Sequence, residues 1–114
     1  MTISSRCAPL ALVLLSACGA PEPCATPHKD WPTAVPASTV SDVITLDGDD
    51  LLRWNGQVIS LQRLRGTLNE ADAKGRSVVF SPAAGASCAA IEAIRLAMVQ
   101  SLSCSQGRCI ETRP

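Results

Sequence analysis

Short apolar runs alternate with two segments of helical period in the part of the chain that follows residue 40. The runs are rich in branched and aromatic side chains, which favours strands over helices. They predict strands at residues 43–46, 51–54, 78–80 and 108–112. The expected order is strand, strand, helix, strand, helix, strand. This order predicts a small α+β domain with both helices packed on one face of the sheet.

Two segments repeat apolar residues at intervals of three and four, as helices with one buried face do. The first follows Ser60, a favourable N-cap, and is expected to end near Gly75. The second is expected from about Ser87 to Leu102. Each helix therefore has one apolar stripe with which to cover the sheet.

The first 18 residues have the order of an export signal. A positive start that includes Arg6 precedes an uncharged run of about eleven residues, too short for the roughly 20 that cross a membrane as a helix. Leu15-Ser16-Ala17-Cys18 follows and is similar to the lipobox of bacterial lipoproteins. The resemblance implies that residues 1–17 are a signal peptide and that Cys18 is acylated and holds the protein to membrane lipid. The alternative is an ordinary signal peptide, cut after a small residue such as Ala20.

Loss of the signal peptide leaves residues 18–114 with nine basic and ten acidic residues, a formal charge of 9 − 10 = −1. No basic face is expected, which argues against nucleic acid as a partner. The length allows one small domain, and so small a core usually needs additional covalent support. Gly19 follows Cys18 where a sorting signal for the inner membrane has Asp. By that resemblance the protein is expected on the outer membrane, facing the periplasm.

Residues 19–39 hold five of the eight prolines and show no apolar period. This composition predicts that residues 18–40 form an extended tether and that residues 41–114 form the domain. At about 3.1 Å per residue, the tether would reach roughly 65 Å. His28 and Trp31 lie in it and receive no role, since Trp31 either docks a partner or folds back on the domain.

Of the six cysteines, Cys7 is lost with the signal peptide and Cys18 is acylated. Four remain: Cys24, Cys88, Cys104 and Cys109. An oxidising compartment predicts two disulfides. In a continuous helix Cys88 and Cys104 would be about 24 Å apart, which excludes that bridge. A right-handed crossover places Cys88 and Cys109 at opposite ends of the sheet, which disfavours their pairing. The expected disulfides are Cys104 with Cys109 and, by elimination, Cys24 with Cys88.

Several motifs between Val43 and Thr112 occur together in one known family. They are Ile44-Thr45-Leu46-Asp47, Trp54-Asn55-Gly56 with Val58, Ser60-Leu61 with Leu64, and Val78-Val79-Phe80. With the long helix before the last strand, they resemble the periplasmic domain of the ExbD/TolR biopolymer-transport family. The resemblance implies a binding domain that forms a homodimer and contacts an energy-transducing transport protein or the peptidoglycan of the cell wall.

The chain departs from this family in two places. Family members begin with a transmembrane helix that carries an aspartate for proton-driven work, and this chain has no such helix and no acidic residue before Glu22. Residues 81–86 also lack the acidic residue that the family has after the central strand. The proton-coupling role is therefore not implied.

An exposed strand at a sheet edge suits the contacts of such a domain, because its outward backbone groups pair with a strand of another chain. We expect the partner either at strand 51–54 with the turn at Asn55 and Gly56, or at the edge formed by residues 108–112. Trp54 is the expected anchor, since aromatic side chains dominate interface energies. The alternative is that Trp54 simply packs in the core.

Catalysis is not expected, because the single histidine, His28, lies in the tether and an activated nucleophile needs a nearby base. A zinc site at Cys24 and His28 is disfavoured where disulfides form, so no metal or cofactor is expected. Cys104 and Cys109 are too far apart in sequence for a Cys-x-x-Cys redox motif. Two functions remain: a binding module for an envelope partner, or a structural envelope lipoprotein with no transport role.

Overall fold

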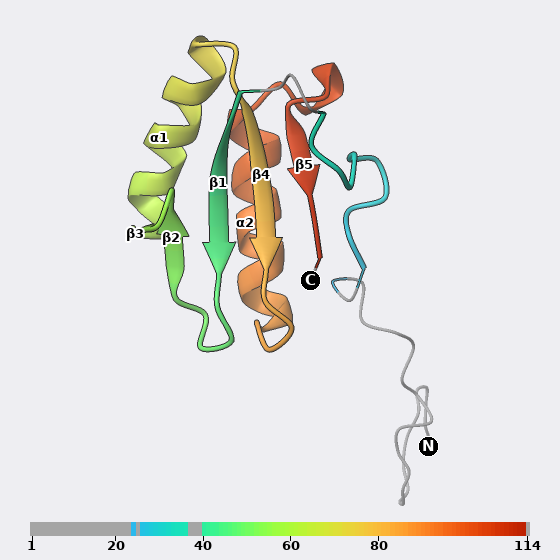
Figure 1. Cartoon of the computed structure of the whole chain (residues 1–114). Coiled ribbons are helices and arrows are strands. Elements are labelled where there is room, and N and C mark those ends of the chain that lie inside the picture. Colours follow the sequence, from blue (N-terminus) through green and yellow to red (C-terminus); the bar gives the residue numbers. More distant parts are fainter. Residues whose placement is uncertain (1–23, 25, 37–39, 114) are drawn as a thin grey trace, which may run out of the picture.

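The computed structural model of the chain describes residue 24, residues 26–36 and residues 40–113 (Figure 1). The predicted signal peptide and Cys18, the predicted site of acylation, lie outside these residues. No helix in the described part is both long enough and apolar enough to cross a membrane.

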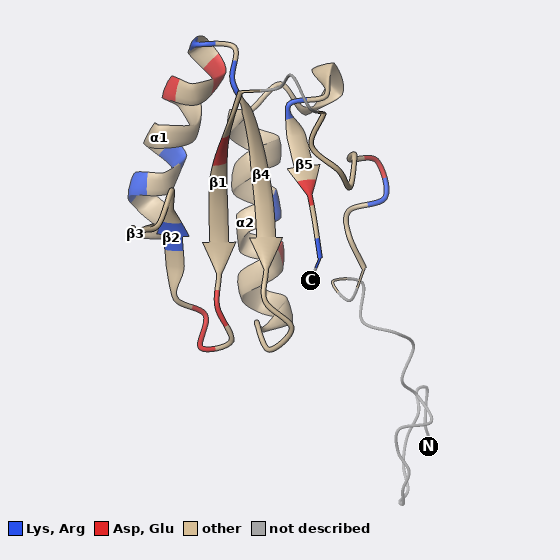
Figure 2. Cartoon of the chain, viewed as in Figure 1, with Lys and Arg blue, Asp and Glu red and all other residues tan. Residues whose placement is uncertain are grey.

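The five strands of the described part form one mixed sheet in the order β3-β2-β1-β4-β5. At its centre, β1 (Ser41–Leu46) and β4 (Ser77–Pro82) run in parallel, and β5 (Cys109–Glu111) continues the parallel half. On the other side, β2 (Leu52–Trp54) and β3 (Gln57–Val58) are each antiparallel to their neighbour. The predicted strands are present, and β3 forms where the sequence predicted only a turn into residues 57–59. The turn between β1 and β2 gathers acidic side chains (Figure 2).

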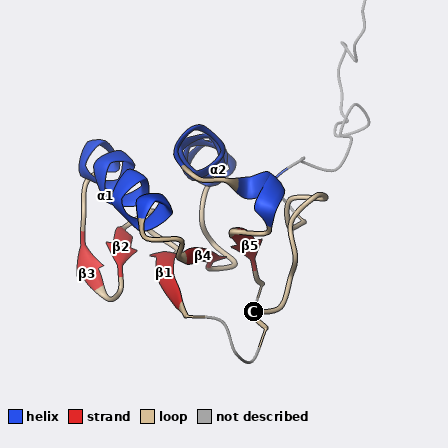
Figure 3. Cartoon of the chain, turned by 90° about the horizontal axis from the view of Figure 1, so that it is seen from above, coloured by secondary structure: helices blue, strands red, loops and turns tan. Residues whose placement is uncertain are grey.

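Both helices cover the same face of the sheet (Figure 3), so the predicted α+β arrangement is confirmed. The helix α1 (Leu61–Ala73) follows Ser60, whose hydroxyl accepts a hydrogen bond from the Arg63 amide at 3.2 Å. Likewise α2 (Cys88–Ser101) follows Ser87, which caps its first turn. Their buried faces meet the sheet in one core, whose largest fully buried side chains are Phe80, Ile44, Leu64, Leu68 and Met98.

The described part of the predicted tether lies against the domain. Trp31 is buried in the core, and the Glu111 amide donates to the Pro32 carbonyl at 3.0 Å. His28 stacks on the Trp31 indole with ring centroids 4.4 Å apart. The expectation of an extended tether is therefore wrong for residues 26–36, because a buried aromatic side chain and contacts with β5 offset the cost of ordering this proline-rich segment.

Two disulfides join the predicted cysteine pairs. Cys24 is bonded to Cys88 with Cα atoms 5.5 Å apart, which fastens the N-terminal segment to the first residue of α2. Cys104 is bonded to Cys109 with Cα atoms 4.8 Å apart. This second bridge closes the short 3-10 helix η4 (Cys104–Gln106) and the turn at Gly107, whose positive φ of 78° suits glycine. Among the described residues no cysteine is free.

Candidate functional site

The two edges of the sheet are exposed to different degrees. At β5 the Glu111 amide donates to the Pro32 carbonyl, so the chain's own N-terminal segment occupies this edge. Partner binding along residues 108–112 stays a prediction, and a partner there would have to compete with this segment. At the opposite edge both residues of β3 are exposed, and Val58 retains 65% of its accessible surface. Within the described part of the chain, the edge at β3 is therefore the open one.

The backbone of Val58 faces outward from this edge. The Ile59 amide donates to the Leu52 carbonyl at 3.1 Å, which makes these two residues a hydrogen-bonded pair of the antiparallel ladder. Arg53 and Val58 form the next pair in the register. Since hydrogen-bonded and non-hydrogen-bonded pairs alternate, the N–H and C=O of Val58 point away from β2. They are placed to pair with an added strand.

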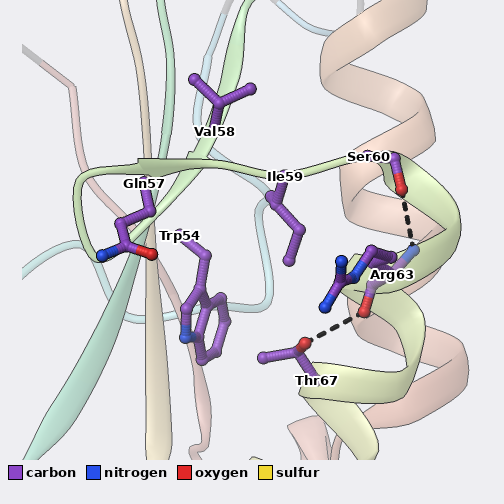
Figure 4. A pocket seen from close by; sticks show the side chains of 7 residues that line it. All are labelled: Trp54, Gln57, Val58, Ile59, Ser60, Arg63 and Thr67. Carbon is purple, nitrogen blue, oxygen red and sulfur yellow. Dashed lines mark hydrogen bonds between the residues drawn. The ribbon is translucent and has the colours of Figure 1, made fainter.

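A groove of about 510 Å³ lies between this edge and α1 (Figure 4). Its walls are Trp54, Gln57, Val58, Ile59, Ser60, Arg63 and Thr67. The Trp54 indole and the Ile59 side chain extend into the space between the β2–β3 hairpin and the helix, and the Val58 side chain projects from the opposite side of the hairpin. The groove therefore combines the apolar side chains of Trp54 and Ile59 with polar ones and with one guanidinium group, that of Arg63.

A second hollow of about 260 Å³ shares Trp54 and Thr67 with the first. Its remaining walls carry charge: Asp42, Glu70, Lys74 and Arg76, with Ala71 between them. Asp42 is buried and accepts two hydrogen bonds from Arg76, at 2.8 and 3.0 Å. The Arg76 guanidinium lowers the pKa of Asp42, so this carboxylate stays ionised and paired at neutral pH. Trp54 thus stands between a groove of mixed polarity and a charged hollow.

The three residues predicted to bind a partner have different structural roles. Trp54 is half-buried, packs against the core and lines both hollows. Asn55 has a positive φ of 50°, and its side chain accepts a hydrogen bond from the Val43 amide and donates one to Asp42. Gly56, with φ of 88°, completes the turn in a conformation that favours glycine. Asn55 and Gly56 therefore shape the hairpin, and Trp54 is the one that reaches the groove.

Sequence reasoning did not name Ile59, Arg63 and Thr67 as groove residues. Ser60, Arg63 and Thr67 recur at intervals of three and four, on the side of α1 next to its apolar stripe. That spacing could have predicted that the three side chains share one side of α1. It does not show that β3 lies across the groove from that side. No group of three or more His, Cys, Asp or Glu side chains that suits a metal ion occurs among the described residues.

No protein-family model matches the chain, and no curated protein matches it. The comparisons therefore assign it to no family.

Proposed function

We propose that this protein is a bacterial envelope lipoprotein, anchored through acyl chains on Cys18, whose periplasmic domain binds a partner without catalysis. The partner we favour is an extended segment of a transport or energy-transduction protein. The observation that carries the proposal is the open β3 edge beside the groove lined by Trp54. Two disulfides support an exported protein, because disulfides persist in oxidising compartments.

The bound segment would lie antiparallel or parallel to β3, with its backbone paired to the N–H and C=O of Val58. One of its apolar side chains would enter the groove against Trp54 and Ile59. Arg63 at the helix side of the groove favours an acidic neighbour in the segment. Because β3 has two residues, backbone pairing is short, and the apolar contact must supply most of the binding energy.

Site-specific photo-crosslinking in cells tests this binding mode. A photoreactive amino acid at Val58 should join the protein to an envelope transport protein. The matched control places it at Leu96, which is 51% exposed on α2. Trp54→Ala should lower the yield at Val58 by about 30-fold, as expected for an aromatic anchor worth roughly 2 kcal/mol.

The other outcomes of this experiment exclude the favoured partner. Adducts with peptidoglycan would show that the cell wall occupies the edge, and a crosslink between two copies would show a homodimer. Equal labelling at Val58 and Leu96, with no effect of Trp54→Ala, would support a structural envelope lipoprotein instead.

The anchor has a separate test in the intact mass of protein extracted from membranes. The expected mass is that of residues 18–114 with acyl chains, and it should rise by four hydrogens when the two disulfides are reduced. A Cys18→Ala variant should lose the acyl mass. A wild-type mass without acyl chains contradicts the anchor.

A further inference from the structure

The N-terminal segment is held to the domain at Cys24 and Thr26, ahead of the contacts already described at Trp31 and Pro32. Cys24 is bonded to Cys88 at the start of α2, and its carbonyl accepts a hydrogen bond from Arg113 at 2.6 Å. The carbonyl of Thr26 accepts from Arg113 at 3.2 Å and also from Arg95. We call these contacts, together with Glu111, the N-terminal clamp.

Glu111 holds both arginines of the N-terminal clamp. Its carboxylate accepts from Arg95 at 2.8 and 2.7 Å and from Arg113 at 2.9 Å. Glu111 is fully buried and the Arg95 side chain is 8% exposed. Hydrogen bonds to charged groups are strong where water is excluded. The positions of Cys24 and Thr26 on the domain are therefore fixed by buried charge as well as by a covalent bond.

The clamp lies toward the end of the domain where α2 begins. The β1–β2 turn and the loop before α2 form the same end, because Asp50 accepts a hydrogen bond from the Ser87 amide at 2.7 Å. The opposite end carries η4, since β5 starts beside Val78 near the start of β4. A chain that leaves the domain at Cys24 therefore leaves close to the acidic turn.

The number of residues between Cys18 and the clamp limits how far the domain can lie from the lipid anchor. Six residues separate Cys18 from Cys24 (24 − 18 = 6), and six residues span at most about 20 Å in any conformation. Without the clamp, the first fixed point would be Trp31, which is buried in the core. Thirteen residues separate Cys18 from Trp31 (31 − 18 = 13), with a reach of roughly 40 Å. The clamp therefore shortens the reach of the anchor about twofold.

We infer that the N-terminal clamp sets how the domain stands on the membrane: the end with the β1–β2 turn faces the lipid headgroups within about 20 Å of the anchor. This inference rests on the lipid anchor of the proposed function. The facing end carries Asp47, Asp49 and Asp50 (Figure 2), which anionic headgroups repel. The domain therefore stands close to the bilayer without lying on it. The β3 edge runs along the side of the sheet opposite β5 and stays accessible.

Energy transfer to headgroup acceptors tests the orientation. The acylated protein from membranes is placed in vesicles of phosphatidylethanolamine and phosphatidylglycerol, with a donor fluorophore at position 49 or at position 106 in η4. Transfer should be strong from position 49 and weak from position 106. The Cys24→Ser and Cys88→Ser double variant should weaken transfer from position 49. The difference in transfer efficiency between positions 49 and 106 should then become smaller.

A second variant tests the same inference without altering the fold. A flexible insert of about twelve residues after Ala20 triples the length of the connection between Cys18 and Cys24. It should weaken transfer from position 49 to a level close to that from position 106. If the clamp does not set the distance, the insert changes little.

The outcomes separate the inference from the proposed function. An acylated protein with equal transfer from both positions, or with transfer that the insert leaves unchanged, overturns the orientation alone. A protein whose mass lacks acyl chains and that does not float with the vesicles overturns the anchor, and the orientation with it.

Discussion

A Glu111→Gln substitution removes the buried carboxylate that Arg95 and Arg113 share. The carboxylate is fully buried, so water does not replace it, and two guanidinium groups lose their common counter-charge. Removing one partner of a buried ion pair costs about 3–5 kcal/mol. Glutamine keeps one acceptor oxygen, so we expect about 3 kcal/mol, the lower end of this range. Because domains are stable by about 5–15 kcal/mol, the variant should fold with a clear loss of stability.

Urea unfolding under non-reducing conditions measures this loss of free energy. Hydrogen exchange provides a local readout, because the amide of residue 111 donates to the Pro32 carbonyl and should exchange faster once the N-terminal segment loosens. Glu92→Gln is the matched control, since Glu92 bonds the same Arg95 but is 50% exposed, and it should cost less than about 1 kcal/mol. A Glu111→Gln variant as stable as this control, with unchanged exchange at residue 111, would refute the assigned role of the buried charge.

Three further variants probe the core, an ion pair and a disulfide. Phe80→Ala should cost about 3–5 kcal/mol in urea unfolding, because Phe80 is fully buried at the centre of the sheet; a cost below about 1 kcal/mol contradicts that position. Asp42→Asn should cost about 2 kcal/mol at neutral pH. Arg76 lowers the pKa of Asp42 from 3.8, so this stabilisation is present above that pH and is lost as the pH falls through the lower folded value. The wild-type and variant stabilities should therefore converge in acid, and a constant gap down to pH 2 opposes this reasoning. Replacing both Cys24 and Cys88 by Ser should cost about 4 kcal/mol from the entropy of the long loop, and an unchanged urea midpoint excludes that contribution.

The main elements could be predicted from the sequence because their signals are local. Branched runs mark the strands, and Ser60 and Ser87 cap the helices at the predicted positions. The disulfides followed from geometry, since a helix of known rise keeps Cys88 and Cys104 apart. These predictions needed only the order of the elements and the handedness of the crossover.

The remaining features depend on contacts between distant residues. The proline-rich segment has no periodic pattern. Its position depends on the burial of Trp31 and on the disulfide between Cys24 and Cys88, which are 64 residues apart in sequence. Arg95 and Glu111 are charged residue types that are rarely buried, so composition favours the surface for both. A signal existed at Arg95, which lies four residues after Ile91 on the apolar stripe of α2. Sequence alone does not show that the Glu111 carboxylate lies beside the Arg95 guanidinium.

The contacts of the N-terminal segment with β5 explain why the proposed lipid anchor and the proposed partner binding do not compete. An uncovered strand at each edge would invite pairing with other chains, and the N-terminal segment removes that risk at β5. The open edge, β3, has two residues, which is too short to bind a strand by backbone pairing alone. In the proposed function, binding at β3 therefore depends on the groove beside Trp54, where side-chain fit would make the contact selective. The strands β3 and β5 lie at opposite edges of the sheet. The N-terminal segment that leads to the anchor is held at β5, and the edge at β3 therefore stays available to a partner.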